Sequence, residues 1–75
     1  MIGFMRGNHT FRIFHDRDEA VREIESGVCA ADAHLYEMAF IGHGEKSVGL
    51  HRDMHESDSG FVERAKLFFA TEPKP

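Results

Sequence analysis

The chain lacks most of the features on which small extracellular domains and membrane proteins depend. Its 75 residues include one cysteine, two prolines and no tryptophan. A single cysteine excludes an intrachain disulfide, and small secreted domains usually need several. No apolar run approaches the ~20 residues that span a bilayer, and we expect no signal peptide. These absences predict a cytoplasmic protein that makes no membrane contact.

Basic residues are also scarce relative to acidic ones. Lys and Arg number nine against 13 Asp and Glu, for a formal net charge of −4. Direct binding to nucleic acid depends on neutralising phosphates, so this balance disfavours it. It favours a partner protein with a basic surface. The six histidines make the sign of the net charge sensitive to mild acid.

The composition is that of a small globular protein, with 41% hydrophobic and 29% charged residues. We expect a single domain over residues 1–72 and a flexible tail at 73–75, marked by Pro73 and Pro75. So short a chain has a thin core and little material to enclose a catalytic cavity of ~300 Å³. Apolar surface left outside such a core favours a homodimer.

The first half of the chain predicts a hairpin and a helix. Alternation predicts strands over Met1–Met5 and Thr10–Phe14, with Phe11 and Ile13 on one face of the second strand and Arg12 on the other. The helix spans residues 16–26.

Capping residues mark both ends of that helix. Asp16 is the expected N-cap, Glu19 completes a capping box, and Gly27 is the expected left-handed C-cap. Its apolar stripe has helical spacing and consists of Ala20, Val21, Ile24 and Val28.

The second half predicts two strands and a second helix. After a connector at 29–32, Ala33–Ile41 is apolar on both faces, which suits a central strand covered on both sides or by a second subunit. A turn at 42–46 leads to a partner strand, Ser47–Asp53. Gly60–Ala70 has helical spacing, although Lys66–Thr71 also suits a strand. The fold class is therefore α+β: an antiparallel sheet of about four strands, in the order ββαββα, with two helices on one face.

A metal site is one candidate for chemistry. His51, Asp53 and His55 share one face of a continuing strand, and two histidines with a carboxylate can hold a metal ion. The spacing lacks the glutamate of the zinc-protease pattern, and solvated histidines are the simpler interpretation. The segment is a candidate metal-binding or pH-responsive module.

Other reactive groups have simpler structural explanations. A base oriented by a carboxylate would resemble His15 beside Asp16, with His9 nearby, but Asp16 already serves as a cap. Cys29 could be activated by His34, yet a lone cysteine after a helix is usually a small buried hydrophobe.

The glycines offer no better case for catalysis. Gly42 and Gly44, with Gly49, lack a phosphate-binding fingerprint and are typical of turns. We assign no catalytic residue and no cofactor.

The acid excess carries the leading hypothesis, a non-enzymatic binding protein. Its carboxylates would dock on the basic, nucleic-acid-binding surface of a larger protein, as a nucleic-acid mimic that excludes the natural ligand. In size and charge alone the chain resembles the small acidic inhibitors made by phages, anti-CRISPR proteins among them. A small dimeric accessory protein is a further alternative. The expected partner-binding residues are Asp18, Glu19, Glu23, Glu25, Glu56 and Asp58.

Overall fold

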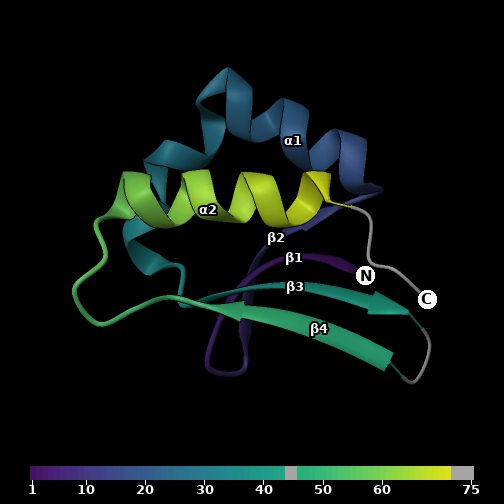
Figure 1. The fold of residues 1–75 in the computed structure, drawn as a ribbon, viewed down its shortest axis with the longest axis horizontal. Helices are drawn as coiled ribbons and strands as arrows, with labels where there is room; N and C mark the ends of the chain where they lie inside the picture. The colour runs from purple at the N-terminus through teal and green to yellow at the C-terminus, as the bar shows by residue number, and fades with distance from the viewer. Residues whose placement is uncertain (44–45, 72–75) are drawn as a thin grey trace.

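The protein folds as a four-stranded antiparallel sheet with two helices on one face (Figure 1). The computed structural model describes residues 1–43 and 46–71. The expected α+β class and the order of strands and helices are confirmed. Two short 3₁₀ helices, η1 and η2, follow α1. The elements are β1 (Ile2–Arg6), β2 (His9–Phe14), α1 (Arg17–Ser26), η1 (Val28–Ala31), η2 (Ala33–Leu35), β3 (Met38–His43), β4 (Lys46–His51) and α2 (Asp58–Ala70).

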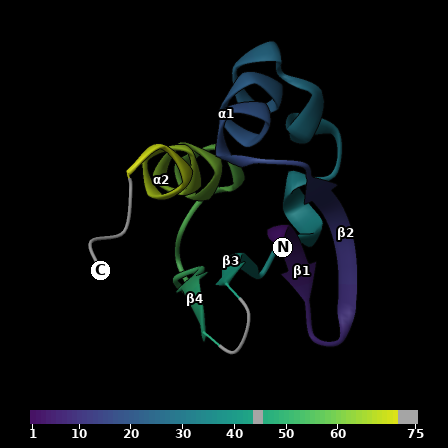
Figure 2. The same cartoon turned by 90° about the vertical axis from the view of Figure 1, so that its right-hand side faces the viewer.

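The strands lie in the order β2-β1-β3-β4, and all neighbours are antiparallel. β1 and β3 are therefore central, while β2 and β4 form the edges. Seen end-on, both helices lie on the same side of the sheet, with α1 toward β2 and α2 toward β4 (Figure 2). The molecule thus has two layers, and its other sheet face has no helix over it among the described residues.

The predicted N-terminal hairpin is confirmed, but its expected side-chain pattern is wrong. A bulge shifts the register of β2 after Phe4, which pairs with Arg12, whereas Met5 pairs with Thr10. Phe11 packs against the core, and Ile13 is 58% exposed. Arg12 lies on the helix-facing side, where it meets Tyr36. An inserted residue reverses the alternation of a strand, so Phe11 and Ile13 do not share a face.

Helix α1 is confirmed together with both caps. The Asp16 side chain accepts a hydrogen bond from the Glu19 amide at 2.8 Å, and Gly27 takes φ 88°, a left-handed conformation that favours glycine. The Glu19 carboxylate accepts from the amide of His15, one residue before the cap. One prediction fails here: Val28 is exposed, because the chain leaves the helix at Gly27 before the stripe ends.

The predicted strand at 33–41 is half right. Residues Ala33–Leu35 form a 3₁₀ turn, and β3 begins only at Met38. Tyr36 is buried between these two elements, and the Arg52 guanidinium donates to the carbonyl oxygens of Ala33 and Tyr36. These contacts hold the segment in a turn although its composition suits a strand.

The second helix is confirmed, and the alternative strand at 66–71 is wrong. α2 begins after Ser57, whose hydroxyl accepts from the Gly60 amide, and it runs to Ala70. The predicted turn at 42–46 is too long, because β3 runs to His43 and β4 begins at Lys46. Residues 44–45 of that turn and the predicted tail at 73–75 lie outside the described residues. None of the described helices is long and apolar enough to cross a membrane.

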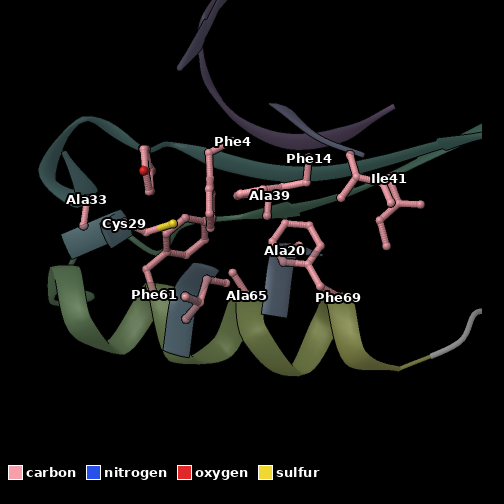
Figure 3. Packing of buried hydrophobic residues seen from close by; sticks show 13 residues of the cluster. Phe4, Phe14, Ala20, Cys29, Ala33, Ala39, Ile41, Phe61, Ala65 and Phe69 are labelled. Atoms are coloured by element: carbon pink, nitrogen blue, oxygen red, sulfur yellow. The ribbon is translucent and has the colours of Figure 1, made fainter. Parts of the chain in front are cut away.

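An aromatic cluster fills the space between the layers (Figure 3). The Phe4 ring stacks on Tyr36 with centroids 4.1 Å apart, and it meets Phe14, Phe61 and Phe69 edge-on. Edge-to-face aromatic pairs contribute about 0.5–1.5 kcal/mol beyond the area that they bury. Small residues such as Ala39 and Ala65 let the helices approach the sheet.

Candidate functional site

Four of the six predicted partner-binding acids lie on α1, and two of them are exposed. Asp18 and Glu25 are exposed, and neither has a hydrogen bond or ion pair with a described residue. Glu23 approaches Arg12 at 3.9 Å, a distance at which the pair is weak. Glu19 is half-buried and is used in the cap of α1. Of the four predicted binding residues on this helix, Asp18 and Glu25 present free carboxylates.

The basic residues near α1 balance these acids only in part. The Arg17 side chain points toward α2, where its Nε donates to the carbonyl oxygen of Phe69 at 2.8 Å. A cation at this position satisfies a carbonyl at the end of α2 and complements the helix dipole. Arg22 is the exposed cation of the helix. The outward face of α1 therefore keeps a negative excess.

The other two predicted binding residues are used within the fold. Glu56 accepts from Arg64 through both carboxylate oxygens, at 2.7 and 2.8 Å, and from the Asp53 amide at 3.1 Å. Hydrogen bonds from Arg64 lower the pKa of Glu56. Asp58 pairs with the Arg52 guanidinium. Because these charges are already neutralised, Glu56 and Asp58 offer less to a basic partner than Asp18 and Glu25.

Arg52 connects the loop between β4 and α2 to the segment that precedes β3. Its guanidinium donates to the carbonyl oxygen of Glu56 as well as to Ala33 and Tyr36, so it joins three segments of the chain. The planar group of an arginine carries five donors, which suits such multiple contacts. Glu56 and Asp58 are consequently part of a structural junction.

A second polar network, which the sequence analysis missed, joins the two halves of the protein. The Tyr36 hydroxyl donates to Asp32 at 2.5 Å and accepts from Arg12 Nε at 3.0 Å. Burial, followed by the hydrogen bond to Asp32, raises the pKa of Tyr36. Arg12 also donates to the Val28 carbonyl. The available signal was an arginine in an otherwise apolar strand, which requires a partner when it faces the core.

The lone cysteine lies in the core beside this network. Cys29 is fully buried in the hydrophobic cluster, and burial raises the pKa of its thiol. A nucleophilic cysteine needs a lowered pKa and access to its substrate. These properties fit the interpretation of Cys29 as a small buried hydrophobe.

The candidate histidines do not form a reactive group in the structure. His51 lies at the end of β4, and Asp53 and His55 lie in the loop that follows. Among the described residues, no three His, Cys, Asp or Glu side chains converge in a way that could hold a metal ion. His15 does approach Asp16, at 3.4 Å, but the pair is exposed on the surface.

Open hollows indent the described surface. One, of about 370 Å³, lies between β4 and α2 and is almost wholly apolar. A second, of about 270 Å³, lies between α1 and the start of α2. A third, of about 300 Å³, is polar and is lined by residues that include Arg6, His34, Glu37 and Asp53.

Comparisons of the chain with protein-family models, with curated proteins and with solved structures found no match.

Proposed function

We propose that the protein is a cytoplasmic, non-catalytic binding protein whose α1 face docks on a basic, nucleic-acid-binding surface of a larger protein. The observation that supports this proposal is the negative excess on α1. Its carboxylates face outward, whereas Arg17 points inward to Phe69. Docked in this way, the carboxylates stand where phosphates would otherwise bind, and the partner's nucleic acid is excluded.

Long-range attraction between unlike charges makes such a complex fast to form and sensitive to salt. Charges on the rim of an interface mainly change the association rate and its salt dependence. Asp18 and Glu25 are suited to this role because they have no described partner within the chain. Glu19 and Glu23 lie on the same helix and add to the local potential.

Charge reversal on α1 tests the proposal. The protein is immobilised, its partner is captured from nuclease-treated lysate of the native host, and binding of the purified partner is measured over a range of salt concentrations. We expect the double variant Asp18→Lys/Glu25→Lys to lose about tenfold or more in affinity and to show a flatter salt dependence. An excess of duplex DNA should displace the wild-type protein from its partner.

The matched control reverses two acids away from α1. Glu37→Lys/Asp53→Lys makes the same change in net charge beside the polar hollow. We expect it to retain most of the affinity. Equal loss in both variants would show that only net charge matters, and unchanged affinity in the α1 variant would refute the proposal.

A further inference from the structure

The two edges of the sheet differ in how they are protected against pairing with another strand. β2 carries a bulge in its pairing with β1, and bulges are one of the devices that keep an edge from pairing further. β4 pairs with β3 in an unbroken register from Lys46 to His51. It contains no proline, and its residues 47–50 are uncharged. Within the described part of the chain, no strand pairs with its other side.

An apolar hollow lies directly beside this edge. Val48 of β4 and Leu67 of α2 line it, together with the buried Ile41 and the half-buried Phe68. Val48 is 47% exposed, although it lies on the helix-facing side of the sheet, and Leu67 of α2 is 66% exposed. A polar backbone edge next to exposed apolar side chains is the arrangement that binds an added β-strand.

We propose that two copies of the protein associate by antiparallel pairing of their β4 strands. A two-fold axis perpendicular to the sheet would join the two sheets into one and leave the helices of both copies on the same side. The two hollows would then adjoin across the axis, and Val48 and Leu67 of each copy would be covered by the same residues of the other. Figure 2 shows β4 at the outer end of the sheet, with α2 above it.

A second copy fits this edge better than a charged peptide does. An antiparallel strand is complementary to its own copy, because each supplies the backbone donors and acceptors that the other lacks. Of the described residues that line the hollow, Arg64 is the charged one, and it is already bound to Glu56. The described lining therefore presents no free charge that would select an acidic or basic partner.

The size of the contact predicts a weak dimer. One six-residue strand and a few apolar side chains per copy lie at the low end of specific interfaces, below about 1,200 Å² in total. We expect a dissociation constant of about 1–100 µM, since contacts of this size are typical of transient complexes. The α1 faces lie away from the axis, so the dimer does not depend on the proposed function.

Sedimentation equilibrium over about 5–500 µM protein measures this association, because the dimer fraction follows mass action. The wild-type protein should pass from monomer to dimer across that range. Val48→Lys and Leu67→Glu should each raise the dissociation constant about tenfold or more, because each buries a charge in the contact. Circular dichroism verifies that both variants fold, which their exposed positions favour. Hydrogen exchange of the β4 amides should slow as the concentration rises.

Two control variants place lysine at equally exposed apolar positions elsewhere. Ile13→Lys lies on the sheet face without helices, and Val28→Lys lies after α1. Both should dimerise like the wild type. A protein that is monomeric at every concentration overturns the proposal. So does a dimer that Ile13→Lys disrupts while Val48→Lys and Leu67→Glu leave it intact, since the sheet face would then be the interface.

Discussion

The chain consists of two successive strand–strand–helix units, and their helices serve the fold differently. α1 buries only Ala20 and Ile24, and its other side presents carboxylates to solvent. α2 buries Phe61, Ala65 and Phe69 beneath the sheet and presents apolar Leu67. The first unit therefore contributes the carboxylates of α1, and the second contributes most of the helical core. An identical order of elements does not imply an equal share of stability or of binding surface.

Truncation of one core residue in each helix should show this difference most strongly. Phe69→Ala removes a ring packed against Phe4 and Phe14, and we expect a loss of about 3–5 kcal/mol. Ile24→Ala, beside the open hollow at the end of α1, should cost about 2–3 kcal/mol. Urea unfolding measures both losses, with Phe69→Leu as a milder variant if Phe69→Ala does not fold. Equal losses from the two helices would contradict the unequal division of the core.

The contact between the two units gives the next largest effect. Tyr36→Phe keeps the ring against Phe4 but leaves Asp32 and Arg12 without the hydroxyl. We expect a loss of about 1–3 kcal/mol in the free energy of unfolding, because two partly buried polar side chains would lose a partner. The neighbouring exposed substitution Glu37→Gln serves as the control. A fully stable Tyr36→Phe variant would mean that the network does not hold the units together.

That contact also marks the limit of what the sequence predicted. The caps Asp16 and Gly27 and the helical spacing of the apolar residues within Gly60–Ala70 are local signals, and they predicted both helices. The turn at 33–35 depends instead on distant residues. Arg12 reaches Tyr36 across 24 positions, and Arg52 reaches it across 16. No local pattern reports such contacts, so apolar composition alone favoured a strand there.

The candidate site was predictable to a similar extent. The acidic residues could be counted from the sequence, but which of them are free to bind a partner could not be predicted. Glu56 and Asp58 are neutralised by arginines at other places in the fold. Arg64 lies on α2, eight positions after Glu56. The inward direction of Arg17 likewise follows from the packing of α1 against α2. Tertiary structure thus distinguishes Asp18 and Glu25 of α1 from Glu56 and Asp58.

Lowering the pH should reduce the stability that comes from carboxylates hydrogen-bonded within each unit. Hydrogen bonds from Arg64 to Glu56, and from the Glu19 amide to Asp16, lower the pKa of both acids. A lowered folded-state pKa gives stability that is present above the unfolded-state pKa and is lost as the pH falls through the folded value. We therefore expect the urea concentration at the midpoint of unfolding to decrease as the pH is lowered from about 5 to about 3.

Substitution of Glu56 separates its share of this acid effect. Glu56→Gln cannot titrate, so the variant should be less stable at neutral pH and should lose less stability on acidification than the wild type. The same urea series provides the comparison. Parallel pH profiles for the two proteins would show that the Glu56–Arg64 pair does not couple protonation to folding.

The smallest effect is expected for the free carboxylates of α1. Asp18→Asn and Glu25→Gln remove charges that have no described partner in the chain, so each should change the free energy of unfolding by no more than about 0.5 kcal/mol. The same substitutions should still weaken binding to a basic partner, because that interaction depends on the outward field of α1. Thermal unfolding with Glu56→Gln as the positive control measures the first effect. A marked destabilisation by either α1 substitution would show that this acid stabilises the fold, as Glu56 does. The carboxylates of the two units would then not differ in their role.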